Sequence, residues 1–261
     1  METLYVIKIG GNIIDDELKL SSFLRLFASL QGKKILVHGG GKLATKLANG
    51  MGIQQQMVEG RRITDAETLK IVTMVYAGYI NKNIVAQLQA NQCDAIGLSG
   101  ADGNLILAHK RKHASIDFGF VGDVDMVNVS LIRKLVEENI ALVVAPITHD
   151  GEGLLLNTNA DTIAQEIAKA ASKYFATTLI YTFEKEGVLR DIENETSVIP
   201  ILFPEEYEQL KKGGHIFEGM IPKLDNAFTA LAYGVNKVVI GKAEQLKELV
   251  IGNSGTTIRH E

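Results

Sequence analysis

Short apolar runs alternate along this chain with longer stretches in which apolar residues recur at helical spacing. The first run, residues 6–9, ends in two glycines, and residues 15–30 then place leucines and phenylalanines three and four positions apart. A second apolar run at 34–38 ends in three glycines and leads into a helical pattern at 42–50. This order of strand, helix, strand and helix predicts parallel strands with functional residues where the strands end.

The same alternation continues to the C-terminus. We expect a long helix over residues 64–91, opened by a capping box of Thr64 and Glu67. Its apolar positions exceed one narrow stripe, so this helix is expected to be buried in the core or in a subunit interface. The other expected segments are a hairpin-like excursion at 105–128, helices at 130–138, 162–172, 204–212 and 222–233, and strands at 95–98, 140–147, 179–182, 237–240 and 256–259.

The composition is that of a globular protein. Hydrophobic residues make up 46% of the 261 residues and charged residues 22%, which excludes a disordered tail. The net charge of -4 gives no indication of a nucleic-acid partner, and Cys93, as the only cysteine, excludes a disulfide framework. The chain opens without a leader pattern and no apolar run is long enough for a membrane span, so we expect a cytoplasmic protein.

The glycine-rich segment 39–44 allows three interpretations. Its spacing, G-x-G-x-x-A between a strand and a helix, is that of dinucleotide-binding folds. Such folds use an acidic residue about 20 positions further on to bind a ribose, but the nearest candidate, Glu59, lies in what looks like a basic loop. The segment could also be a tight turn, or its exposed N–H groups could bind a phosphate or carboxylate.

The positions of two lysines and one aspartate suggest that their charges serve a binding site. Lys8 lies in an apolar strand, where it needs either an anionic partner or a route to solvent. Lys223 follows Pro222 in the first turn of a helix, the unfavourable end for a cation, which suggests a bound anion. Asp161 lies in another first turn, where it either complements the helix dipole beside the cap Asn159 or serves a site. Together with the glycine-rich strand ends, these residues suit phosphate handling.

Other enzyme signatures are missing from the sequence. It contains no G-x-x-x-x-G-K-[ST] loop, no H-R-D triplet of protein kinases, no G-x-S-x-G elbow and no H-E-x-x-H pair. These absences argue against a P-loop enzyme, a serine hydrolase and a zinc protease.

A set of motifs, in order and spacing, resembles the N-acetylglutamate kinases of the amino-acid kinase superfamily along nearly the whole chain. The segments that carry the resemblance are Val6–Gly11, His38–Gly41, Gly60–Thr64, Gly97–Gly100, Gly119–Gly122, Asn157–Asp161 and Gly219–Lys223. The resemblance implies a three-layer αβα sandwich around a mainly parallel sheet. It also implies an acylglutamate-binding and dimerisation lobe at residues 1–172 and an ATP-binding lobe at 173–261.

The implied activity is phosphoryl transfer from MgATP to the side-chain carboxylate of N-acetyl-L-glutamate, or of another N-acyl-L-glutamate, in arginine biosynthesis. By similarity, Lys8 and Lys223 stabilise the phosphoryl group in transfer and Asp161 holds both lysines. The residues that the resemblance implies for the acyl substrate are Gly11, Gly40, Gly41, Arg62 and Asn157. No protein ligands to a metal are implied, because Mg²⁺ is held mainly through the nucleotide phosphates.

The implied nucleotide site matches the family pattern less closely than the implied acyl substrate site does. It matches Gly10, Glu184, Lys185, Glu186, Gly187, Val188, Leu189, His215, Ile216 and Phe217. The family pattern after this strand is Asp-Val-x-Gly, whereas this chain has Glu-Lys-Glu-Gly at 184–187, and Ala101 stands where lysine is usual.

Arg61 is a further departure, because the family generally has an apolar residue before the substrate-binding arginine. It either faces solvent or adds positive charge near the acyl pocket, which would suit a dicarboxylic acyl group such as succinyl.

The resemblance also implies a homodimer paired through the helix after Thr64, and insensitivity to arginine, because the inhibited members carry an additional N-terminal helix. Two alternatives are another kinase of the superfamily, acting on carbamate, aspartate, glutamate or UMP, and a dinucleotide-binding protein without kinase activity.

Overall fold

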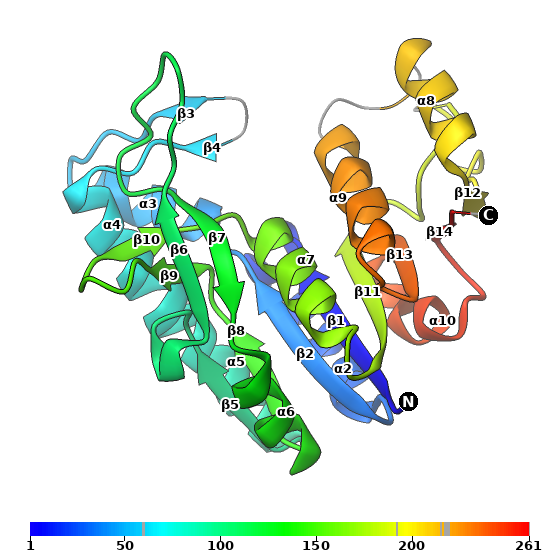
Figure 1. Ribbon diagram of the computed structural model, residues 1–261, viewed down its shortest axis with the longest axis horizontal. Coiled ribbons are helices and arrows are strands. Elements are labelled where there is room, and N and C mark those ends of the chain that lie inside the picture. Colours follow the sequence, from blue (N-terminus) through cyan, green and yellow to red (C-terminus); the bar gives the residue numbers. More distant parts are fainter. Residues whose placement is uncertain (59–60, 192, 215, 217–219, 261) are drawn as a thin grey trace.

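One eight-stranded sheet runs through the whole molecule (Figure 1). The computed structural model describes residues 1–58, 61–191, 193–214, 216 and 220–260, with only the backbone of Arg61. All neighbouring strands of this sheet pair in parallel except β13 and β14. In spatial order the strands are β12 (Ile201–Leu202), β14 (Thr256–Ile258), β13 (Lys237–Lys242), β11 (Ala176–Phe183), β1 (Thr3–Ile9), β2 (Lys33–His38), β8 (Ala141–Val144) and β5 (Ala95–Leu98).

Helices cover both faces of the sheet, because its central strands are apolar on both sides. Every residue of β8 is buried, as are the six central residues of β11. One face packs on α6 (Val129–Glu137), α7 (Ala160–Ala171) and α9 (Ile221–Ala232), and the other on α2 (Glu17–Ser29), α5 (Asn81–Ala90) and α10 (Leu246–Ile251). The predicted three-layer αβα fold is therefore confirmed.

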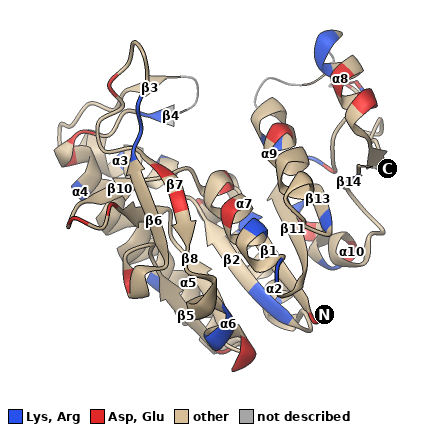
Figure 2. Cartoon of the chain, in the orientation of Figure 1, with Lys and Arg blue, Asp and Glu red and all other residues tan. Residues whose placement is uncertain are grey.

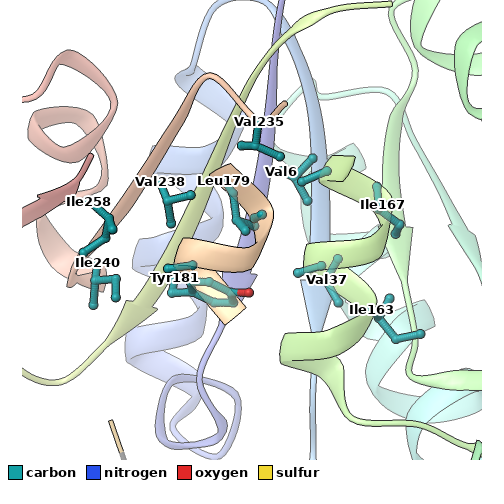
Figure 3. Packing of buried hydrophobic residues seen from close by; sticks show 14 of the residues in the cluster. Val6, Val37, Ile163, Ile167, Leu179, Tyr181, Val235, Val238, Ile240 and Ile258 are labelled. Atoms are coloured by element: carbon teal, nitrogen blue, oxygen red, sulfur yellow. The ribbon is translucent and has the colours of Figure 1, made fainter. Parts of the chain in front are cut away.

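Alternate residues of each strand supply the two apolar cores. The core under α7 and α9 is drawn in Figure 3, which labels Ile163 and Ile167 of α7 among its residues. Val6, Val37, Leu179, Tyr181 and Val238 belong to this core, and Ile7, Leu36, Ile180 and Val239 belong to the core on the other face.

Two smaller sheets lie beyond the C-terminal ends of β2 and β8. The antiparallel pair β6 (Ile106–Lys110) and β7 (Gly122–Val127) forms the expected hairpin and joins β9 (Ile147–His149) and β10 (Leu155–Asn157). A second hairpin consists of β3 (Met57–Val58) and β4 (Arg61–Arg62). The remaining elements are α1 (Gly11–Ile14), α3 (Gly41–Gly50), η2 (Asp102–Asn104), α8 (Pro204–Lys212) and η4 (Ala243–Gln245).

The long helix predicted at 64–91 has a different start and an irregular middle. Its cap is Asp65, whose side chain accepts a hydrogen bond from the backbone N–H of Thr68, so the predicted capping box at Thr64 is wrong. The backbone N–H and C=O of Thr64 instead bond the loop at residues 118–120. The helix runs as α4 (Ala66–Thr73), a π-helical segment η1 (Met74–Ile80) and α5.

The single strand predicted at 140–147 is also wrong in part. Pro146 separates β8 of the large sheet from β9 of the smaller one, because proline has no N–H for a ladder. Among the described helices, none is long and apolar enough to cross a membrane.

The large sheet continues across the predicted boundary between the lobes. β1 pairs with β11 over its full length, from Thr3 with Ala176 to Ile9 with Thr182. The boundary at 172/173 stays a prediction, and it would fall between α7 and β11, inside one continuous sheet.

Candidate active site

Lys8, Asp161 and Lys223 meet at the C-terminal edge of the large sheet. Lys8 is the second-last residue of β1, and the other two lie in the first turns of α7 and α9. Lys8 Nζ lies 2.8 Å from Asp161 Oδ1, and Lys223 Nζ donates a hydrogen bond of 2.5 Å to Oδ2. The structure thus brings together the three residues predicted to be catalytic, whose roles stay predictions.

The three charged side chains of this cluster are largely buried, so they interact strongly with one another. The side chains of Lys8, Asp161 and Lys223 are 12%, 14% and 23% exposed. Burial lowers the pKa of Lys8, the charge of Lys223 lowers it further, and Asp161 opposes both. Burial alone would raise the pKa of Asp161, but the two lysines outweigh it and hold that pKa well below its usual value. With both lysines protonated, the cluster carries one net positive charge and favours an anion.

The first turn of α7 holds Asp161 in place. The Asn159 side chain caps this helix by accepting hydrogen bonds from the backbone N–H groups of Asp161 and Thr162. Tyr181 of β11 donates its hydroxyl to the carbonyl of Asp161 at 3.2 Å. The expected cap at Asn159 is therefore confirmed, and Asp161 is an ion-pair partner of both lysines. That Asp161 serves a site stays a prediction. Its Oδ1 is buried and accepts no hydrogen bond from the described residues, because the Lys8 pair lacks hydrogen-bond geometry.

The glycine-rich ends of β1 and β2 lie side by side, because these strands are parallel neighbours. Gly10 is the residue before α1, and Gly40 is the residue before α3. Gly40 has a φ of +147°, and a Cβ atom there would lie 2.2 Å from Cδ1 of Ile80 and 3.1 Å from the ring of Tyr76. The π-helical segment η1 therefore packs directly on this turn and leaves room for glycine only.

A cavity of about 200 Å³ opens beside this glycine turn. Its described lining comes from both hairpins, the glycine turn and the segment that enters α7. The lining residues are Gly39, Gly40, Gly41, Met57, Arg62, Tyr76, Arg111, Val121, Pro146, Asn157, Thr158, Asn159 and Ala160. Because Ala160 directly precedes Asp161, the cavity adjoins the lysine and aspartate cluster.

Arg62 and Asn157, predicted to bind the substrate, share this cavity. The Arg62 side chain bonds the carbonyl of Gly41 at 3.0 Å, the hydroxyl of Thr45 at 2.8 Å and the side chain of Gln55. Asn157 donates its amide to the Thr64 hydroxyl at 3.0 Å. Both side chains are thus fixed by neighbours on the walls of the cavity.

Apart from Gly10, the described residues predicted to bind the nucleotide follow β11 in the chain. Glu184 accepts a hydrogen bond from Asn12, Lys185 pairs with Glu195 at 2.6 Å, and Glu186 pairs with Lys242 at 3.1 Å. His215 and Phe217 lie outside the described residues.

Three residues of this predicted set are packed into the protein. Val188 and Ile216 belong to the core under α9, and Val188 donates its N–H to the Thr256 hydroxyl at 2.8 Å. A Cβ atom at Gly187 would lie 2.7 Å from the same hydroxyl, so this glycine permits close packing on β14. The backbone of Leu189 forms an isolated antiparallel β-bridge with that of Val198. The nucleotide contacts of all these residues stay predictions.

Sequence reasoning missed several residues at this edge. Asn12 accepts a hydrogen bond from Lys42 and donates one to Glu184, and so links the glycine-rich segments to the end of β11. Tyr76 and Arg111 line the cavity. The only local signal was the lysine directly after the three glycines. The positions of Asn12, Tyr76 and Arg111 depend on long-range packing, which leaves no local signal.

The charges of this edge suit the phosphates of a nucleotide. Within the described part of the chain, no three His, Cys, Asp or Glu side chains lie close enough to hold a metal ion. The buried carboxylate of Asp161 already pairs with two lysines. That Mg²⁺ is held through the phosphates of the nucleotide stays a prediction.

Comparison with known proteins shows the family of this chain. Residues 3–242 match the Amino acid kinase family. Acetylglutamate kinase of Cytophaga hutchinsonii is 59% identical over 254 residues, which are 97% of this chain and 96% of that protein. Acetylglutamate kinase of Phocaeicola vulgatus is 53% identical over 99% of both chains.

Solved structures show the same fold. N-acetylglutamate synthase of Neisseria gonorrhoeae, complexed with coenzyme A and N-acetyl-glutamate, superposes with a TM-score of 0.84 at 21% identity. This chain is covered completely in that comparison and spans 60% of the synthase chain. Carbamate kinase of Giardia lamblia bound to AMP-PNP has a TM-score of 0.71 at 14% identity. That comparison covers 100% of this chain and 99% of the carbamate kinase chain.

Proposed function

This chain belongs to the amino acid kinase family, and from that premise we propose that it phosphorylates an N-acyl-L-glutamate. The reaction transfers the γ-phosphoryl group of ATP to the side-chain carboxylate of N-acetyl-L-glutamate or a related N-acyl-L-glutamate. The products are an acyl phosphate and ADP. The name of the relatives, acetylglutamate kinase, supports N-acetylglutamate as an acceptor. The place proposed for this reaction is arginine biosynthesis.

The observation that carries this proposal is that the cavity and the lysine cluster are neighbours. Ala160 lines the cavity with Arg62 and Asn157, and the next residue, Asp161, pairs with Lys8 and Lys223. An acceptor whose α-carboxylate lies on Arg62 can therefore extend its side chain toward the two lysines. The other end of the lysine cluster is left for the phosphates of the nucleotide.

The chemistry needs no general base. A glutamate side chain has a pKa of about 4.3, so its carboxylate is already ionised at neutral pH. The carboxylate oxygen attacks the γ-phosphorus, the new P–O bond forms, and the bond to the leaving ADP breaks without a proton transfer. The barrier arises because an anion approaches a polyanion, and fixed positive charges lower it.

Each member of the cluster has a role in this step. Lys8 and Lys223 stabilise the charge on the phosphoryl group in transfer, and Asp161 holds both ammonium groups in place. The low pKa of Asp161 makes it a counter-charge and a poor base. Gly40 and Gly41, with Gly10 and Gly11, present backbone N–H donors at the starts of α3 and α1. Mg²⁺, when bound with the nucleotide, supplies further charge neutralisation.

The cavity favours an acylated amino group over a free one. A free α-ammonium group would call for a carboxylate in the pocket, and none of the described lining residues is Asp or Glu. This observation argues against free glutamate as the acceptor. The part of the cavity beyond Arg62 then determines which acyl group the acceptor carries.

The chain is proposed to act as a homodimer in the cytoplasm. The helix of α4, η1 and α5 carries Met74 and Tyr79, which are 53% and 63% exposed. These two exposed side chains on one helix suit a contact with a second copy. The single cysteine, Cys93, is free and buried, which suits a reducing compartment.

Hydroxylamine trapping of the acyl phosphate tests this function. With ATP and Mg²⁺, we expect hydroxamate from N-acetyl-L-glutamate and none above background from glutamate or carbamate. A Lys223→Met variant should lose most of this activity, whereas Lys211→Met, which removes a partly exposed lysine of α8 that pairs with Asp225, should retain it. Absence of product from every acylglutamate would refute the assignment, and full activity of Lys223→Met would refute the mechanism.

A further inference from the structure

A second arginine shares the cavity with Arg62. Arg111 directly follows β6, and both arginines line the space where the proposed acylglutamate would lie. Arg62 and Asn157 account for the α-carboxylate, and the lysines account for the side-chain carboxylate. The uncharged acetyl group of N-acetylglutamate offers nothing to the positive charge of Arg111. Asp123 of β7 pairs with Arg111, whereas an acetyl group gives this arginine no ligand in the cavity.

The guanidinium of Arg111 is fixed on one of its edges. Its Nε donates to both carboxylate oxygens of Asp123 at 3.1 Å, and its Nη2 also bonds Oδ1. The group lies over the ring of Phe118, 5.6 Å from the ring centre. The main chain is fixed as well, because the N–H of Arg111 bonds the carbonyl of Val121 at 2.7 Å. Figure 2 shows the basic end of β6 beside the acidic strand β7.

The remaining terminal nitrogen of the guanidinium, Nη1, is not used by Asp123. Arg111 is 13% exposed, and its Nη1 donates no hydrogen bond to the described residues. Nη1 and Nη2 form the second edge of the guanidinium, and a carboxylate matches such an edge with two parallel hydrogen bonds. Met57 and Val121 line the same cavity and offer apolar contact to methylene groups.

We propose that Arg111 receives a carboxylate at the far end of the acyl group. The acceptor would then be an N-acylglutamate whose acyl group is a dicarboxylic one of succinyl length. This inference rests on the proposed kinase function and adds the class of acyl group. The hypothesis from the sequence gave this role to Arg61, whose side chain lies outside the described part of the chain, whereas the structure places Arg111 on the cavity wall.

The test compares acceptors that differ only at the end of the acyl chain. The purified full chain is assayed with N-succinyl-, N-succinamyl- and N-acetyl-L-glutamate, where the succinamyl compound replaces the terminal carboxylate by an amide. We expect kcat/KM to be at least about tenfold higher for the succinyl compound than for either of the others, as a hydrogen-bonded charge predicts.

The variant Arg111→Gln separates a specificity role from a structural one. It should lower kcat/KM for the succinyl compound between about 10- and 150-fold and change that for the acetyl compound less than about threefold. A purely structural Arg111 would instead lower both values by the same factor. Arg133→Gln, which removes a half-exposed arginine of α6, is the matched control and should change neither value.

The outcomes distinguish this inference from the function on which it rests. If the wild-type chain uses the acetyl compound as well as or better than the succinyl compound, the inference is wrong and the kinase function stands. If no acylglutamate is phosphorylated, both are wrong. The wild-type comparison decides the question even if Arg111→Gln does not fold.

Discussion

Lys8 and Asp161 form a buried ion pair of 2.8 Å between the first strand of the chain and the start of α7. Lys223 pairs with the other oxygen of the same carboxylate, so one aspartate separates two cations that would otherwise repel each other. The arrangement keeps two ammonium groups close together at the edge where the proposed phosphoryl transfer takes place. It makes the geometry of both lysines depend on a single side chain.

The Asp161→Asn variant tests this dependence. An amide of the same shape removes the counter-charge, so the lysines repel and leave their positions. We expect kcat in the hydroxamate assay to fall about 10²- to 10³-fold, the usual loss when one preorganised electrostatic contact is removed. The control is Glu166→Gln on the same helix, which breaks only the pair with Lys169 and should keep activity. Activity of Asp161→Asn within twofold of the wild type would show that the lysines need no counter-charge.

His38 should make the stability of the protein depend on pH. The ring is fully buried, contacts the carbonyl of Gly39 at 2.8 Å, and faces the Asn81 amide at 3.2 Å. Burial, aided by the charge of Lys82 and opposed by the Gly39 contact, lowers its pKa to about 4. Because the folded pKa lies below the unfolded value of 6.5, the unfolded chain binds more protons between these values. The contribution of His38 to stability is therefore complete above about pH 6.5 and is lost as the pH falls toward 4.

From pH 7.5 to 5.0 this loss should reach about 2 kcal/mol in the free energy of unfolding. Urea unfolding at both pH values measures it, with His38→Asn as the variant that lacks the group. The exposed His113, changed to Asn, serves as the control and should show the same loss as the wild type. An equal loss in His38→Asn and wild type would contradict the prediction.

Gly40→Ala should destabilise the protein, because the new methyl group would collide with the buried side chain of Ile80 in η1. The positive φ adds backbone strain. Together we expect a loss of about 1–3 kcal/mol in the free energy of unfolding, measured in urea. The matched change is Gly39→Ala, where a Cβ atom would meet nothing within 4 Å and stability should be retained. Equal stability of the two variants would mean that the turn and η1 can move apart.

The exposed apolar residues of η1 test the proposed dimer. Met74→Glu and Tyr79→Glu place charges on that surface, so we expect the mass from light scattering to halve at micromolar protein concentration. Tyr233→Glu changes a tyrosine that is 66% exposed at the end of α9 and should leave the mass unchanged. A dimer that persists in both η1 variants would place the interface elsewhere.

The sequence predicted the sheet well, because strands buried on both faces read as continuous apolar runs. It also predicted the meeting of Lys8, Asp161 and Lys223, through a family resemblance and the unfavourable place of a lysine at a helix start. Periodicity could not decide the cap of α4, since Thr64 and Asp65 are both good caps and the bridge to Gly119 engages Thr64.

Other features depend on contacts between distant segments and leave no local signal. The π-helical turn η1 packs on Gly40, more than thirty residues earlier in the chain. Arg111 reaches the cavity because β6 pairs with β7 and Asp123 then orients its guanidinium. In the sequence alone, Arg111 is one of several basic residues in a polar stretch.

The ladder between β1 and β11 has a consequence for the chain as it leaves the ribosome. β1 is synthesised first, but the strand that completes its hydrogen bonds begins at Ala176, after about two thirds of the chain. During that interval a strand that is apolar on both faces keeps one unpaired edge, which can recruit the edges of neighbouring nascent chains. Aggregation during synthesis should therefore be the main hazard for this fold, and it should end when β11 emerges and docks.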